Sequence, residues 1–176
     1  MERELRQQDI IDKAMSVFIQ RGYKATTTSE IAKVAEISEV TLFRYFKSKQ
    51  EIFMAGIEPF MDQSLTILRA HDEEARDDER LLKILKERVY FISQNHLVIK
   101  LILNEHAVIE DGMSILNSMV KSLNEVLEEM GIQDRSGLQL RLLMGTFLSY
   151  LYLPKTDPVS MEVHLKSVVK TLLESK

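Results

Sequence analysis

The chain has 176 residues, of which 45% are hydrophobic and 28% are charged, and its formal net charge is −4. That length and hydrophobic content allow one or two domains with a substantial buried core. The absence of cysteine excludes a disulfide framework, a thiolate nucleophile and a cysteine-based zinc site.

The first eight residues, MERELRQQ, are charged where a secretory signal would need an apolar run. Later apolar stretches are interrupted by Lys100 or end at Pro154, so none reaches the length of a membrane span. We therefore expect a cytoplasmic protein that has no membrane partner.

Residues 25–53 carry signals for three closely spaced helix starts. Thr27 and Ser48 each begin an S/T-x-x-E capping box, and Ser38 is a good N-cap. Apolar residues recur at helical spacing between these caps, so two short helices can pack on each other. The pattern predicts a helix-turn-helix followed by a third helix, which makes DNA the first partner to consider.

The second of these short helices has a mixed polar and apolar face that a major groove about 12 Å wide could admit. This face consists of Glu39, Val40, Thr41, Phe43, Arg44 and Lys47. The alternative is a three-helix bundle that does not bind DNA, in which the caps and apolar stripes only stabilise the fold.

Spaced motifs extend this pattern over about the first third of the chain. They are the Phe-x-x-x-Gly-Tyr close of the first helix, the Ile-Ala-x-x-Ala of the second, and Ser-x-x-Thr-Leu-Phe-x-Tyr-Phe-x-x-Lys across the third. With these motifs the stretch resembles the DNA-binding domain of the TetR family of transcriptional regulators. The resemblance implies a small DNA-binding head fused to a larger helical body that dimerises and binds an effector.

The resemblance also implies contact roles at matching positions. Thr28 looks like a phosphate ligand, and Val40 and Thr41 look like base readers. Tyr45 and Lys49 fall where family members touch the DNA backbone. Arg44 is a further candidate for a DNA contact, because its side chain is long and positively charged.

Three positions depart from the usual pattern of the family. Glu36 stands where the turn normally has glycine, and a side chain in a left-handed conformation there would cost roughly 1 kcal/mol or more. Phe43 replaces a tyrosine and lacks its hydroxyl, although the ring could pack on sugar or a thymine methyl. Glu39 could accept from cytosine N4 or repel phosphates.

The charge is unevenly distributed along the chain. Residues 1–49 contain nine Lys/Arg and seven Asp/Glu, so the acidic balance belongs to the rest. A weakly positive head implies few phosphate contacts per subunit, and two subunits are then needed for useful affinity at physiological salt. We therefore expect a homodimer.

Beyond residue 49 the pattern stays helical, so the predicted fold is all-α, with domains at 1–48 and 49–176. Residues 71–79 are predicted to be a solvated connection, and Pro59 is expected to bend the helix that contains it. Helices are predicted near 49–69, 80–94, 96–109, 112–130, 136–153 and 158–174.

Two apolar stripes near the C-terminus are predicted to form a four-helix dimer interface. The alternative is that both stripes face the core of their own subunit. The predicted interface residues are Leu140, Met144, Phe147 and Leu151 on one helix, and Leu165, Val168, Val169 and Leu172 on the next.

Seven of the nine methionines lie after residue 50 and, with nearby phenylalanines, could line an adaptable cavity for a small lipophilic effector. Such residues at helical spacing also serve as plain core. The candidate lining residues are Phe60, Met61, Phe91, Met113 and Phe147.

Metal binding and catalysis find little support. His106 and Glu110 share a helical face, but no second histidine or cysteine completes a metal site. No nucleophile with a nearby base and no glycine-rich phosphate loop is present. We expect no cofactor, no metal and no enzymatic activity.

The sequence therefore predicts a ligand-responsive transcriptional regulator, a repressor that binds a near-palindromic operator on double-stranded DNA as a dimer and is released by a small apolar effector. The alternative is a helical dimeric interaction module that has lost sequence-specific DNA binding. A small helical enzyme would need a site assembled from distant residues.

Overall fold

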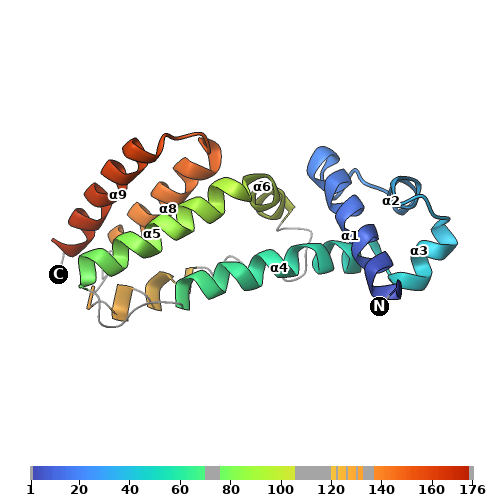
Figure 1. The fold of residues 1–176 in the computed structure, drawn as a ribbon, viewed down its shortest axis with the longest axis horizontal. Coiled ribbons are helices and arrows are strands. Elements are labelled where there is room, and N and C mark those ends of the chain that lie inside the picture. Colours follow the sequence, from blue (N-terminus) through green and yellow to red (C-terminus); the bar gives the residue numbers. More distant parts are fainter. Residues whose placement is uncertain are drawn as a thin grey trace. The chain divides into compact units, whose positions relative to one another are not determined.

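The computed structural model describes residues 2–69, 76–105 and 137–174, together with 120–121, 123–125, 127–129 and 131–132, and of residues 64–69 it describes the backbone alone. Every helix or strand assigned in these ranges is an α-helix, which confirms the predicted all-α class (Figure 1). No helix among these residues is both long and apolar enough to cross a membrane.

Most of the predicted helix boundaries are confirmed to within a few residues. Both ends of the predicted 49–69 helix and the start at residue 158 are matched, whereas most of the predicted 112–130 helix lies outside the described residues. The helices are α1 Glu2–Arg21, α2 Thr28–Val34, α3 Glu39–Tyr45, α4 Lys49–Arg69, α5 Asp77–Gln94, α6 His96–Glu105, α8 Leu138–Tyr152 and α9 Pro158–Leu173.

Helix α5 begins earlier than predicted. Asp77, Asp78 and Glu79 form its first turn rather than part of a solvated connection. Carboxylates there are favoured by the partial positive charge of a helix N-terminus. Arg76, at the N-cap position, pairs with Asp78 at 2.6 Å.

The chain divides into two compact units. The first, which we call the head, comprises Met1–Met61 and Lys100–Met113, of which the second segment is described as far as Glu105. The second, the body, comprises Asp62–Ile99 and Ser114–Lys176. The head therefore extends past the predicted boundary at residue 48, and helices α4 and α6 contribute residues to both units.

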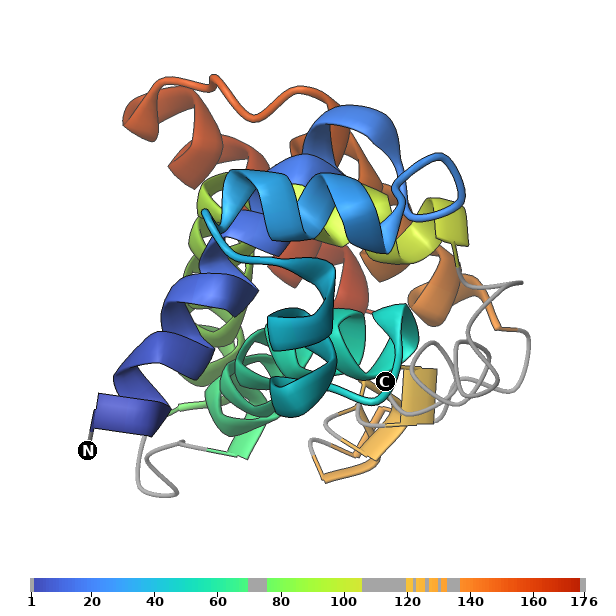
Figure 2. The same cartoon turned by 90° about the vertical axis from the view of Figure 1, so that its right-hand side faces the viewer.

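The core of the head contains a cluster of three aromatic rings. Phe53 of α4 contacts Phe18 of α1 edge-on with ring centroids 5.3 Å apart, and Tyr23 lies 5.0 Å from Phe53. A Cβ at Gly56 of α4 would overlap the side chain of Met15 on α1, so the two helices approach each other there. Helix α1 also packs on α2, and α2 on α3 (Figure 2).

In the body, α5 packs against both α8 and α9. Most of the residues predicted for the dimer interface are buried by this packing in the core of their own protomer. The residues buried in this way are Phe147, Leu151, Leu165, Val168, Val169 and Leu172. Of the predicted interface residues only Leu140 and Met144, both half-buried, keep some exposed surface.

Other apolar side chains of the body are exposed. They lie on α8, at the start of the following loop, and on the first two turns of α9, and they are between 41% and 73% exposed. We call this set of residues the outer apolar face. It consists of Leu138, Leu148, Tyr152, Leu153, Val159 and Val163.

Candidate nucleic-acid interface

Helix α2 begins with the predicted capping box. The Thr27 hydroxyl oxygen accepts from the Glu30 backbone N–H at 3.2 Å, and the Glu30 carboxylate accepts from the Thr27 N–H at 2.9 Å. The bond from the Thr27 backbone contributes most to holding the pKa of Glu30 below its usual value. The start of α2 is therefore fixed by its own side chains.

The turn between α2 and α3 has the hydrogen bonds of a Schellman motif. The Glu36 N–H donates to the Lys33 carbonyl at 3.2 Å, and the Ile37 N–H donates to the Ala32 carbonyl at 3.0 Å. Glu36 itself is left-handed, with φ of 56°. The condition for the expected strain is thus met, since this conformation favours glycine.

Helix α3 begins at Ser38, whose hydroxyl oxygen accepts from the Thr41 N–H at 3.1 Å. The two hydroxyl oxygens of these residues lie 2.8 Å apart. Thr41 is half-buried. Its hydroxyl is thus oriented by a neighbour in the free protein and retains a further lone pair for a partner.

The outward face of α3 carries Val40, Phe43 and Arg44. Val40 is 70% exposed and Phe43 is 50% exposed, whereas Leu42 on the opposite side is fully buried. Exposed apolar groups on so short a helix, beside an exposed guanidinium, suit the thymine methyl groups and acceptor edges of a major groove.

Two of the predicted contact residues are hydrogen-bonded to each other. The hydroxyl of Thr28, the first residue of α2, donates to the carboxylate of Glu39, the first residue of α3. This bond connects the two short helices at their N-terminal ends. It also places a negative charge beside the residue that the family resemblance assigns to phosphate.

The Lys49 ammonium group is engaged inside the head, in a way that sequence reasoning missed. It donates to the carbonyl oxygens of Tyr23 and Thr26, each at 2.8 Å, and lies 4.3 Å from the centroid of the Tyr23 ring. Burial lowers its pKa. Lys49 therefore holds the loop between α1 and α2, and this role is independent of the predicted contact with the DNA backbone.

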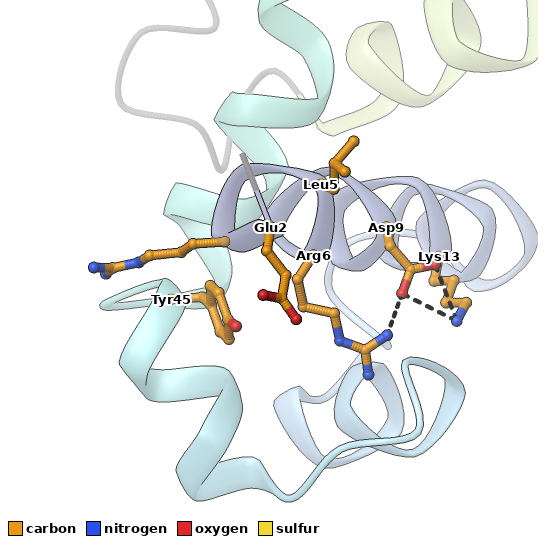
Figure 3. Close-up of a pocket in the computed structure, with 7 residues that line it drawn as sticks. Glu2, Leu5, Arg6, Asp9, Lys13 and Tyr45 are labelled. Atoms are coloured by element: carbon orange, nitrogen blue, oxygen red, sulfur yellow. Dashed lines mark hydrogen bonds and ion pairs between the residues drawn. The ribbon is translucent and has the colours of Figure 1, made fainter.

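A surface hollow beside the end of α3 adds residues that sequence reasoning did not select. Its lining comes from α1 and from Tyr45 (Figure 3). The Arg3 guanidinium lies 6.0 Å from the centroid of the Tyr45 ring. Arg6 bonds to Asp9 at 2.7 Å and to the Ala35 carbonyl at 3.0 Å. The sequence signal that could have identified this surface is the presence of three basic residues, Arg3, Arg6 and Lys13, on one helix.

The predicted effector-site residues are divided between the units. Phe60 and Met61 are half-buried in the head, while Phe91 and Phe147 are buried in the body. Met113 lies outside the described residues, as do His106 and Glu110, the pair considered for a metal. In the described part of the chain no three metal-ligating side chains come together.

Residues 10–55 match the family model described as bacterial regulatory proteins, tetR family. This range covers α2 and α3 with most of α1 and the first turns of α4, which are the elements that form the core of the head.

Several relatives share this similarity. The chain is 31% identical to the HTH-type transcriptional regulator YvkB of Bacillus subtilis over 118 residues, which are 67% of the chain and 61% of YvkB. It is 28% identical to the fatty acid metabolism regulator protein of the same organism, over 76% of the chain and 73% of that protein. It is 24% identical to the biofilm operon icaADBC negative transcriptional regulator IcaR of Staphylococcus aureus, over 85% and 87%.

Solved structures resemble the chain over nearly its whole length. A bacterial regulatory protein in the tetR family from Rhodococcus RHA1 superposes with a TM-score of 0.78 at 17% identity, covering 95% of the chain and 96% of that protein. The likeness of fold therefore includes the body as well as the head.

Proposed function

The chain belongs to the TetR family of bacterial regulatory proteins, and from this premise we propose that it is a cytoplasmic transcriptional repressor that binds a near-palindromic operator as a homodimer. The observation that carries the proposal is the outward face of α3. Val40, Phe43 and Arg44 are exposed there on a helix whose start and preceding turn are both fixed by hydrogen bonds.

In this proposal Val40 and Thr41 read bases, with Phe43 packing on sugar or a thymine methyl group. Thr28, Arg44 and Tyr45 contact the DNA backbone. Arg3 joins them, because its exposed guanidinium lies over the Tyr45 ring and adds a positive charge beside a residue proposed to touch phosphate.

The dimer would form through the outer apolar face. Isolated exposed apolar residues are ordinary, but this face gathers several of them on two helices that are consecutive in the described chain. An isologous contact between two such faces would supply the second head. Two heads would then meet half-sites roughly 34 to 36 Å apart or a multiple of that distance.

The proposed effector is a small apolar molecule bound in the body, where Phe91 and Phe147 belong to an apolar core. One relative is named as a fatty acid metabolism regulator, which supports a lipophilic ligand class. Binding would shift α4 and change the spacing of the heads. A tenfold change in DNA affinity requires about 1.4 kcal/mol of difference between the two states.

Repression is proposed because IcaR, a relative that aligns along most of the chain, is named as a negative regulator. In such a mechanism the free dimer occupies its operator and the effector releases it.

The decisive experiment is selection of random duplex DNA by the purified, ligand-free protein at physiological salt, followed by sequencing of the retained DNA. Non-specific attraction is weak under these conditions. We expect enrichment of a motif with two-fold symmetry. Failure to enrich any motif, with the protein folded and dimeric, would favour the interaction module instead.

A further inference from the structure

The last residue of α6 reaches the loop between α1 and α2. The Glu105 carboxylate accepts a hydrogen bond from the Tyr23 backbone N–H at 3.2 Å, although the two residues are 82 positions apart. Glu105 is only 9% exposed. Neighbouring Gly22 has φ of 83°, and a Cβ there would lie 3.1 Å from the Glu105 Oε1 atom.

The same loop is held from another side by the first residue of α4. Lys49 bonds to the carbonyl oxygens of Tyr23 and Thr26. Burial lowers the pKa of Lys49, whereas the negative charge of Glu105 acts in the opposite direction and favours the ammonium form. Glu105 therefore supports the loop directly, by accepting from the Tyr23 N–H, and indirectly, because its charge favours the ammonium form of Lys49 that bonds to the loop.

This loop leads directly into the first of the DNA-facing helices. Thr26 directly precedes Thr27, which is the N-cap of α2, and α2 packs on both α1 and α3. The Thr26 hydroxyl also donates to the Gly22 carbonyl at 2.8 Å, which closes the loop on itself. A change in the loop would consequently change how α2, and α3 with it, are held on α1.

We propose that Glu105 is a positioning residue of the DNA-binding surface, through which the end of α6 holds the α1–α2 loop in the form that presents α3 to DNA. The first residues of α6, through Ile99, belong to the body. A displacement of α6 that begins in the body would withdraw Glu105 and loosen the loop. Only the effect on DNA binding rests on the function proposed above.

The first test measures backbone amide exchange at Tyr23 by NMR in the full-length protein. Glu105→Ala should speed exchange at Tyr23 by about tenfold, because the hydrogen bond and the opposing charge are both lost. Glu105→Gln keeps an acceptor oxygen and should restore most of the protection. The matched control, Glu58→Gln, removes an exposed carboxylate from α4 and should leave the rate unchanged. An unchanged rate in Glu105→Ala would overturn the proposal.

A second test separates communication along α6 from simple stabilisation. Val98 is buried near the start of α6, in the body. Val98→Ala should speed exchange at Tyr23 several-fold in the wild-type background and have no further effect in Glu105→Ala. The same factor in both backgrounds would show that α6 does not act through Glu105.

A third test uses the duplex enriched by selection as the probe. Glu105→Ala should bind it several-fold more weakly than wild type, with unchanged far-UV circular dichroism, and Glu105→Gln should bind nearly as wild type does. Wild-type affinity in Glu105→Ala, despite faster exchange at Tyr23, would contradict the positioning role. Should no duplex be enriched, the proposed function fails while the two exchange tests still decide whether α6 holds the loop.

Discussion

Glu36 is the residue at which the side chain and the backbone conformation conflict. Its φ of 56° lies in the left-handed region, and it occupies the position of a Schellman motif that usually holds glycine. The hydrogen bonds of the turn nevertheless form. We therefore expect the side chain at this position to reduce stability, while the turn keeps the hydrogen bonds of a Schellman motif.

Glu36→Gly should stabilise the protein by about 0.5–1 kcal/mol, because glycine adopts this conformation without strain but loses more entropy on folding. The midpoint of urea unfolding would show the gain. Glu36→Ala is the control, since it removes the charge and keeps the Cβ. An equal gain from both variants would assign the effect to charge rather than to the backbone.

Glu39 lies on the surface proposed to face DNA and accepts a hydrogen bond from Thr28. Glu39→Gln keeps an acceptor for this bond while removing one negative charge. We expect tighter binding to every duplex, by about two- to fivefold at low salt, because repulsion of phosphates is relieved. A selective loss of preference at cytosine positions would instead show that the carboxylate reads a base.

At the scale of elements, the capping residues explain why the helix boundaries could be predicted. Thr27 and Ser38 begin α2 and α3 with the expected bonds. Ser48 also caps α4 as expected, although the Glu51 carboxylate accepts from the Lys47 N–H, one residue before the cap. Such signals are local, because the residues that specify each start lie within four positions of it.

Contacts between distant elements could not be predicted in the same way. The stripe on α9 had the right spacing for burial, but the sequence did not show whether α5 or a second subunit would cover it. Likewise, the carbonyl partners of Lys49 lie more than twenty positions upstream. Periodicity identifies which side of a helix is buried, whereas the identity of its neighbour depends on the tertiary fold.

Helices α5 and α9 are joined by the Glu162 carboxylate. It accepts from Lys166 on its own helix, with an ion-pair distance of 2.8 Å, and from Lys86 on α5 at 2.9 Å. The hydrogen bond from Lys166 contributes most, followed by that from Lys86, and together these lysines lower the pKa of Glu162 from 4.5 to about 2.

A depressed carboxyl pKa stabilises the folded state above the unfolded pKa, and this stability is lost as the pH falls through the folded pKa. Wild type should therefore be more stable than Glu162→Gln above about pH 4.5, and the difference should shrink as the pH falls toward 2. Urea unfolding at several pH values measures this difference in the free energy of unfolding. Glu174→Gln, near the end of α9, is the control. A difference that is independent of pH would exclude the charge as its cause.

At the scale of the whole molecule, we expect operator affinity to depend on dimerisation through the outer apolar face, because one weakly positive head makes few phosphate contacts. Val163→Glu places a charge in this face. We expect a monomer in sedimentation and a loss of operator affinity of about a hundredfold or more, since linked binding of two heads is abolished.

The control for this prediction is Gln94→Glu, which adds the same charge at an exposed position of α5. It should leave both the dimer and the operator affinity unchanged. A Val163→Glu variant that stays dimeric would move the interface away from the outer apolar face.

The division of the chain into units has a consequence for protein engineering. A designer working from the sequence would transplant this head by cutting after residue 48, and would discard Lys49 together with Ile52, Phe53 and Ile57, which are buried in the head. Glu105 would be lost as well, since it comes from a remote part of the chain. Residues 1–48 alone are therefore unsuitable for transfer to another protein. New operator specificity is better sought by altering the outward face of α3 in the intact protein.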